Sequence, residues 1–370
     1  MIDAERPRSR GQMMIITALL LAVLLVGLAL VLNSAIYTEN LSTREAGGSL
    51  EPLSSDVPTE RRLTASLAHT NYNDETATYD ERVTRVRSNV SRWGEMQRES
   101  STRQGQLVSS DLTAVKNGTR VTQTNHGHFE SANSSLLEAD ILNLSADTDW
   151  QAAPESERRG FRMAVQRDSL RETNPNLTAT ITNLLDAALT GTDTFWTRFE
   201  AGGNTYRMYL LDDSTNDSVA AVVTEYEDDD NEEVIGTCSS EAPDPTDNVT
   251  INVSTGTLYG ADGETDCPAL KTASGNHGEL YFVGADHVEG TYRFIADRPE
   301  SEFRDALTDE YDGLVGGLID TLTGDDIYED DPADGEPYTT TAVYAVSVES
   351  TYADDRVTHT RNRTLAPVGR

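Results

Sequence analysis

Lysine is the scarcest charged residue in this chain. Only Lys116 and Lys271 occur among 370 residues, so nearly all of the 29 basic residues are arginines. Against them stand 63 acidic residues, which gives a formal net charge of −34. The sequence shows no basic patch that could neutralise the phosphates of a nucleic acid, and this excludes nucleic-acid binding. A surface of one sign repels itself in dilute buffer, whereas salt near 1 M screens the repulsion within about 3 Å. The composition therefore indicates a halophilic protein, and a cation-storing protein is the alternative.

Cysteine is equally rare. Cys238 and Cys267 enclose a segment rich in Asp, Thr, Gly and Pro, with little apolar material to hold it closed. We predict a disulfide between them, formed outside the cytoplasm and worth about 3 kcal/mol in the chain-entropy model. Two unrelated buried thiols are the alternative. No CxxC or Cys/His spacing indicates a metal site.

Familiar catalytic motifs are missing as well. The chain contains no Gly-x-Ser-x-Gly elbow, no His-Glu-x-x-His helix, no phosphate loop and no dinucleotide fingerprint. We therefore predict that the protein is not an enzyme and uses no cofactor. An anchored hydrolase whose residues come from distant parts of the chain is the rival expectation.

One long apolar run is present, close to the N-terminus. Residues 13–32 carry no charge, and a helix of that length measures about 30 Å, the thickness of the hydrocarbon core of a bilayer. A cleaved secretory signal has a shorter apolar core and a small-x-small site, which Asn33-Ser34-Ala35 matches poorly. We predict a retained transmembrane helix over 13–34.

The flanks of this run set its orientation. Arginines at positions 6, 8 and 10 precede it, whereas the first basic residue after it is Arg44. The positive-inside bias therefore keeps a cytoplasmic leader, 1–12, inside and places the bulk of the chain outside the cell membrane. Asn-x-Ser/Thr sequons support export and predict a glycoprotein. They occur at Asn40, Asn89, Asn117, Asn133, Asn143, Asn176, Asn216, Asn248, Asn252 and Asn362.

The residues directly before the run carry a second signal. Arg10-Gly11-Gln12 resembles the class III signal of archaeal type IV pilin-like proteins. Residues 8–45 as a whole resemble haloarchaeal membrane-anchored proteins with pilin-like N-termini, a family without an assigned activity. The resemblance implies that a prepilin peptidase cuts between Gly11 and Gln12 and that the helix is retained. Many pilins carry Glu at the fifth position of the mature helix, where this chain has Ile16. A minor pilin or pseudopilin is therefore favoured over a major filament subunit.

Beyond the membrane, residues 35–190 are predicted to form a mostly helical stalk. A helix is expected to start at Asp56 and to run to about Met96. Within it, Tyr79, Val83, Val86, Val90 and Trp93 step by four and three, which predicts an apolar seam. The seam needs a partner, either a following helix at about 101–115 or 131–144, or a neighbouring subunit. Further helices are expected over 155–170 and 179–189.

Residues 191–370 change to a period of two, which predicts a strand-rich extracellular domain. A hairpin is expected at Gly202-Gly203-Asn204, followed by a strand over 218–227. Other strands are expected at 249–259, 279–283 and 290–297, a helix from Ser301, and a C-terminal hairpin around 353–355. The fold class is therefore α+β: a transmembrane helix, a helical stalk and a domain of antiparallel strands.

Two kinds of cluster are candidate ion sites. Acidic stretches at 225–233, 262–266 and 325–336 could bind Ca²⁺, but none has the full pattern of a calcium loop, and solvated loops are the favoured interpretation. The His126-x-His128-x-Glu130 trio could hold a transition metal if it were extended. Its flanks favour a surface loop, so no metal site is predicted.

These features together predict a single-span, surface-exposed structural or interaction protein, namely a minor pilin-like subunit of a pilus-like or secretion assembly. Its expected partners are the lipid bilayer, other pilin-like subunits and a prepilin peptidase. A stand-alone anchored ectodomain that binds an ion, a ligand or an envelope component is the alternative from another class.

Overall fold

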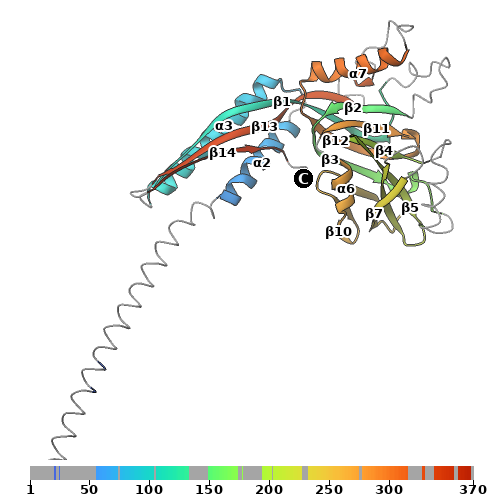
Figure 1. Ribbon diagram of the computed structural model, residues 1–370, viewed down its shortest axis with the longest axis horizontal. Helices are drawn as coiled ribbons and strands as arrows, with labels where there is room; N and C mark the ends of the chain where they lie inside the picture. Colours follow the sequence, from blue (N-terminus) through green and yellow to red (C-terminus); the bar gives the residue numbers. More distant parts are fainter. Residues whose placement is uncertain are drawn as a thin grey trace, which may run out of the picture. The chain divides into compact units, whose positions relative to one another are not determined.

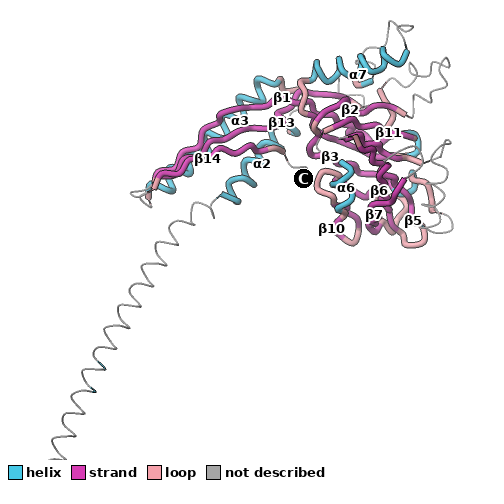
Figure 2. Tube along the Cα trace, viewed as in Figure 1, coloured by secondary structure: helices cyan, strands magenta, loops and turns pink. Residues whose placement is uncertain are grey.

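The computed structural model describes most of the chain beyond residue 55. The described ranges are 56–73, 76–103, 106–132, 149–173, 177, 194–201, 203–226, 232–274, 277–315, 327–329, 337–353 and 357–367, together with Leu21 and Leu25. The chain divides into two compact units between Arg61 and Arg62. Antiparallel strands predominate in the second unit and helices are few (Figure 2), which confirms the α+β class at this level.

The strands form two antiparallel sheets (Figure 1). Sheet A has eight strands in the order β10 (Gly263–Asp266), β9 (Thr257–Gly260), β8 (Asn248–Asn252), β3 (Arg158–Gln166), β12 (Glu289–Ala296), β1 (Leu107–His128), β13 (Tyr338–Ala353) and β14 (Thr358–Leu365). Sheet B has six, in the order β2 (Trp150–Ser156), β11 (Gly278–Val283), β4 (Trp196–Ala201), β5 (Asn204–Asp213), β6 (Ser218–Tyr226) and β7 (Glu232–Glu241).

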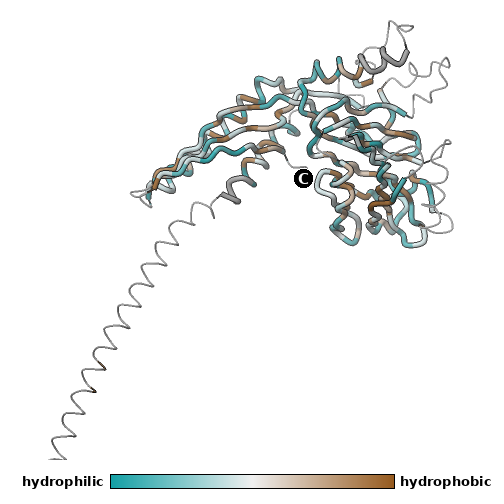
Figure 3. Tube along the Cα trace, in the orientation of Figure 1, coloured by the Kyte–Doolittle hydropathy of each residue, from teal (hydrophilic) through white to brown (hydrophobic). Residues whose placement is uncertain are grey.

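The main core lies between the two sheets. Alternate residues of β3, such as Phe161 and Val165, meet Phe199 of β4 and Phe282 of β11 there, and all four are at most 1% exposed. The Phe161 ring meets the Phe199 ring edge to face and stacks on the Phe282 ring. It also meets Phe294 of β12 edge to face, with the two ring centroids 5.6 Å apart. Figure 3 shows hydrophobic segments in the region where the sheets overlap. Each buried aromatic side chain removes a large apolar area from water, so these rings contribute strongly to the main core.

Short helices accompany the sheets. α6 (Pro268–Ser274) and α7 (Glu300–Val315) contribute buried side chains to the main core. The 3₁₀ turns are η1 (Arg167–Ser169) and η2 (Ala285–His287). The helix expected from Ser301 is therefore confirmed, with Phe303 and Leu307 fully buried.

The segment predicted as one helix from Asp56 to about Met96 is in fact two. α2 (Asp56–Tyr72) begins where expected, and α3 (Tyr79–Thr102) starts anew after a break. A capping box starts α3: the Thr78 hydroxyl accepts from the backbone N–H of Glu81, whose carboxylate accepts from the backbone N–H of Thr78. This reciprocal pair satisfies two of the N–H groups that a helix start leaves open.

The apolar seam of α3 packs on sheet A and on α2. Val86, Val90 and Trp93 form a second core with Leu67 of α2 and with β13, in particular Val346. The prediction that a following helix covers this seam is wrong, and no neighbouring subunit is needed to bury it. A one-sided apolar stripe is satisfied by a sheet face as well as by a helix.

The helix predicted over 101–115 is also wrong, because β1 occupies most of this range. Val108, Leu112 and Val115 step by four and three, the spacing of a helix face. In β1 the register shifts between Leu112 and Ala114, so that Leu112 lies opposite Val348 and Val115 opposite Val346. This bulge returns Leu112 and Val115 to the same face and imitates the helical period.

The helix predicted over 155–170 is wrong for a related reason. Phe161 and Val165 are four apart, which fits a helix, but β3 also buries Met163 between them, and this completes a period of two. Thus β1 and β3, which were assigned to the mostly helical region 35–190, share sheet A with β12 and β13. The helices expected at 131–144 and 179–189 lie largely outside the described residues.

The short-range predictions within 191–370 are confirmed. β4 and β5 pair antiparallel up to Ala201 opposite Asn204, with Gly203 at φ +91° in the turn, and β6 follows as the third strand. The C-terminal hairpin joins β13 and β14 with Ala353 opposite Thr358. The strands β11 and β12 lie where alternation predicted them. One range differs: the single strand expected over 249–259 is two strands, β8 and β9, which pair antiparallel on either side of a turn.

Candidate functional site

Polar side chains gather where β1 ends beside β12. Gln123 of β1 pairs with Tyr292 of β12, and Gly127 pairs with Gly290. Between these two pairs β1 advances by four residues and β12 by only two, so β1 contains extra residues there. Extra residues in one strand of a pair redirect the side chains around them. Gly290 permits this arrangement, because a Cβ atom there would overlap the carbonyl oxygen of Ala164 on β3.

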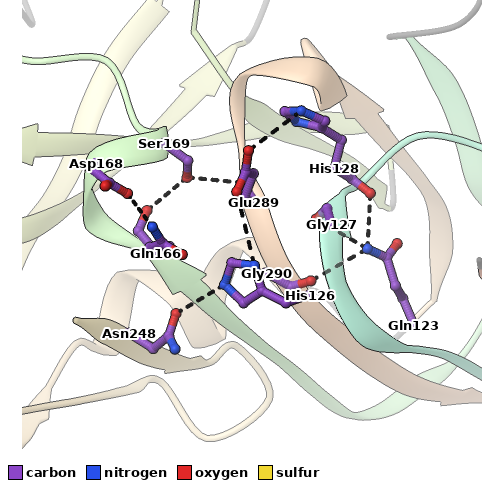
Figure 4. Close-up of polar contacts among 10 residues, drawn as sticks. All are labelled: Gln123, His126, Gly127, His128, Gln166, Asp168, Ser169, Asn248, Glu289 and Gly290. Carbon is purple, nitrogen blue, oxygen red and sulfur yellow. Dashed lines mark hydrogen bonds and ion pairs between the residues drawn. The ribbon is translucent and has the colours of Figure 1, made fainter. Parts of the chain in front are cut away.

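The buried amide of Gln123 holds this irregular end of β1 in place. Its Nε2 donates to the carbonyl oxygens of His128 at 2.9 Å, Gly127 at 3.2 Å and Gly290 at 3.4 Å (Figure 4). Bonds from a buried amide to several carbonyls fix a backbone that lacks regular ladder bonds. The positions of His126 and His128 are therefore set by the strand pair.

Two imidazoles approach one carboxylate at this position. His128 Nε2 lies 3.6 Å from Glu289 Oε1, and His126 Nδ1 lies 4.0 Å from Glu289 Oε2. The other nitrogen of His126, Nε2, lies 3.4 Å from Asn248 Oδ1 on β8. Glu289 itself is held through its backbone N–H, which donates to Ser169 Oγ at 2.9 Å. Figure 4 shows both rings directed toward Glu289.

The three side chains are exposed to solvent by 37% (His126), 45% (His128) and 42% (Glu289). When the imidazoles are protonated, each forms an ion pair with Glu289, but solvent screens such exposed pairs and makes them weak. The described residues contain no group of three His, Cys, Asp or Glu side chains placed to hold a metal ion.

The His126-x-His128-x-Glu130 trio differs from its prediction in two respects. His126 and His128 lie in β1 and not in a loop, and their carboxylate partner is Glu289 of another strand. No local pattern could have identified Glu289, because it reaches the histidines through the pairing of β1 with β12.

The predicted disulfide is present. Cys238 and Cys267 are bonded, with their Cα atoms 5.8 Å apart. Cys238 belongs to β7 at the edge of sheet B, and Cys267 directly follows β10 at the edge of sheet A. The enclosed segment holds more apolar material than expected, since Val249, Ile251 and Leu258 are fully buried. The bond therefore joins the two sheets at their margins.

The sequons divide by exposure. Four sequons lie outside the described residues, namely those at Asn40, Asn133, Asn143 and Asn176. The predicted processing site, Gly11 and Gln12, lies outside them as well. Exposed sequon residues are Asn89, Asn216, Asn248 and Asn362, whereas Asn117 is half-buried. Asn252 is only 2% exposed, and its Oδ1 accepts from the backbone N–H of Thr255. A glycan cannot be attached to that amide in the folded protein.

The acidic clusters use part of their carboxylates in hydrogen bonds. Glu232 pairs with Arg207 at 2.9 Å and accepts from the hydroxyls of Tyr209 and Thr224. Asp262 accepts from the Ser240 hydroxyl at 2.8 Å. These carboxylates stabilise local structure, and most of the 325–336 stretch lies outside the described residues.

The N-terminal apolar run is described only at Leu21 and Leu25, both helical. Among the described residues, no helix has both the length and the apolar character needed to cross a membrane.

Comparison with known proteins does not assign this chain to a family. No protein-family model matches this chain. No curated protein matches it either.

Proposed function

We propose that this protein is a single-span cell-surface protein that serves as a minor pilin- or pseudopilin-like subunit of a surface assembly. The observation that carries the proposal is the exposure of the two described residues of the apolar run, Leu21 and Leu25. Leu21 and Leu25 are helical, four positions apart, and 63% and 58% exposed. Residues at this spacing share one helix face, and an exposed apolar face indicates contact with lipid or with other subunits.

The disulfide supports an extracytoplasmic position for the second unit. Disulfides persist in oxidising compartments and are rare in the cytoplasm, where thiols are kept reduced. Cys238–Cys267 lies beyond the apolar run in the sequence, which agrees with the orientation that the N-terminal arginines favour.

Assembly would move the N-terminal helix from lipid into a bundle of like helices. Small residues at Ala18, Ala22, Gly27 and Ala29 permit close approach of helix backbones there. The strand-rich unit would then be displayed at the surface of the assembly. The function proposed is structural, with no chemical step.

Mass spectrometry of the N-terminus tests the processing step that this function requires. Protein isolated from its native membrane should begin at Gln12, and the Gly11→Leu variant should keep Met1. The Gly47→Ala variant is the matched control and should be processed normally. A wild-type chain that keeps Met1 in the membrane would contradict the pilin-like proposal.

Crosslinking in the native membrane then tests assembly. A cysteine placed at Ala22 should form crosslinks to a second helix, whereas one placed at Asp111, exposed on β1, should not. A chain that is processed at Gln12 but never crosslinks through position 22 would be a stand-alone anchored protein.

A further inference from the structure

A cavity of about 400 Å³ lies on the face of sheet A that points away from sheet B. β1, β12 and β3, adjacent in the sheet, form its floor, and Tyr72 at the end of α2 closes one side. Its charged lining residues are Arg120, Arg162 and Arg293, one from each strand. Among the described residues that line it there is no carboxylate, although the chain holds 63 acidic residues.

Strand register places two of these arginines side by side. Arg293 of β12 lies opposite Arg162 of β3 on one side and opposite Thr122 of β1 on the other. Opposed residues of an antiparallel pair share a face, so Thr122, Arg293 and Arg162 form one row across three strands. Like charges directly opposite each other destabilise a sheet. Burial and the nearby charge of Arg293 both lower the pKa of Arg162.

The third arginine adds charge at the same place. Arg120 is two residues before Thr122 in β1, so it points to the same face, and it is only 1% exposed. Its guanidinium carbon lies 5.7 Å from the centre of the Tyr72 ring, and that of Arg293 lies 4.5 Å from the same ring. Tyr72 therefore lies beside both guanidinium groups.

A buried hydroxyl completes the lining. Thr122 is 6% exposed, and its Oγ1 has no hydrogen-bond partner among the described residues. A buried hydroxyl without a partner costs free energy that a bound ligand can recover. The clustered arginines and the unpartnered Thr122 hydroxyl are both unfavourable for the stability of the fold. Unfavourable arrangements of this kind are typically kept at functional sites.

We propose that this cavity binds a small oxyanion, namely the carboxylate, sulfate or phosphate group of a ligand of about the size of a monosaccharide. Guanidinium groups match the geometry of carboxylate, sulfate and phosphate oxygens and can bind them through paired hydrogen bonds. The Thr122 hydroxyl donates a further bond, and the Tyr72 ring offers an apolar wall for the body of the ligand. The volume falls in the lower part of the usual range for small-molecule sites.

Calorimetric titration of the full chain in detergent tests this proposal, at one ionic strength fixed with potassium chloride. The probes are glucuronate, methyl glucoside as its uncharged counterpart, inorganic sulfate and inorganic phosphate. At least one anion should bind with one site per chain, and methyl glucoside should not. Stronger binding of glucuronate than of the inorganic ions would identify a sugar acid as the ligand type. Equal binding would identify the oxyanion group alone.

Three variants locate the site. Arg162→Gln and Arg293→Gln should each weaken anion binding about tenfold or more, and Arg293→Lys should retain part of it. Arg361→Gln, on the exposed strand β14, is the matched control and should bind as the wild type does.

Stability gives a second measurement that does not depend on calorimetry. Without anion, Arg293→Gln should unfold at the same temperature as the wild type or higher, because it removes repulsion from Arg162. The anion should raise the melting temperature of the wild type and not that of this variant. The proposal is overturned if no anion binds, or if both glutamine variants bind with wild-type affinity.

Discussion

At the scale of single residues, long-range partners decide what each polar group does. Asp297 follows β12 and accepts hydrogen bonds from Lys116 Nζ of β1 and from the backbone N–H of Glu157, both at 2.8 Å. Lys116 is one of only two lysines in the chain. This carboxylate therefore joins three segments that are far apart in sequence: β1, the connection between β2 and β3, and the end of β12.

The Asp297 contact predicts a pH dependence. Burial acts to raise the pKa of Asp297, but the hydrogen bonds from Lys116 and Glu157 together lower it below its usual value. A carboxyl whose pKa is lowered by folding stabilises the fold above its unfolded pKa of about 4, and this contribution is lost as the pH falls through the folded pKa. Asp297→Asn should cost about 1 kcal/mol at pH 7.

Urea unfolding between pH 2 and pH 7 measures this effect. The difference between the wild type and Asp297→Asn should shrink as the pH falls below about 4. Asp111→Asn, which changes an exposed carboxylate of β1, should leave the profile nearly unchanged. An equal difference at all pH values would show that the Asp297 charge does not contribute.

Local spacing in the sequence predicts side-chain pairs that are close along the chain. It does not predict pairs that only strand pairing brings together. His126 and His128 were visible as a pair, but Glu289 was not. Arg162 and Arg293 were equally invisible as neighbours. Their proximity depends on which strands pair and in which register, and short-range patterns do not encode this.

At the scale of elements, the sequence predicts turns from local residue types, but it does not predict irregularities within strands. The β4–β5 hairpin was predicted because Gly203 and the flanking alternation are local signals. β1 was missed because its bulge between Leu112 and Ala114 gives a helix-like spacing. The break between α2 and α3 is indicated in the sequence by Thr78 and Glu81, whose spacing is that of a capping box at a helix start.

The second core predicts a stability effect within one chain. Trp93 is 8% exposed and packs with α2, β13 and β14. Trp93→Ala should destabilise the protein by about 3–5 kcal/mol, because it leaves a large cavity. Met96→Ala, at a 56% exposed position of the same helix, should change stability little. Chemical unfolding at several protein concentrations measures both variants, and a loss that depends on concentration would point to a neighbouring subunit as the partner of the seam.

At the scale of the whole molecule, the disulfide is a link between two sheets. Replacing Cys238 and Cys267 together by serine should lower the free energy of unfolding by about 3 kcal/mol. Thiol labelling supplies an independent check, since the chain has only these two cysteines. Denatured but unreduced protein should show no reactive thiol, and label on either cysteine would contradict the bond.

Net charge sets the salt dependence of the whole molecule. With a formal charge of −34, repulsion between carboxylates should destabilise the fold at low salt. The Debye length falls from about 10 Å at 0.1 M to about 3 Å at 1 M, so most of the stabilisation should be gained below about 1 M. Melting curves in sodium chloride and sodium bromide should coincide in this range. A melting temperature that does not rise with salt would contradict the charge argument.

The order of strands in sheet A could not be predicted from the sequence. β1 lies between β12 and β13, and both of these strands are far from it in the sequence. Such pairings follow from the fit of complete faces, as when β1 contributes Val121 to the main core and Leu112 to the second core. No window of local sequence contains that information.

The length of β1 gives the protein a mechanical property. This strand has 22 residues, about 70 Å at the usual rise, and it pairs with β13 over most of that length. Tension applied at the N-terminal end of α3 passes into β1 and pulls it lengthwise against β13. Ladder bonds that are loaded in shear must break together, whereas bonds at the end of a hairpin break one after another. The β1–β13 pair is therefore suited to bear tension along its strands without unravelling.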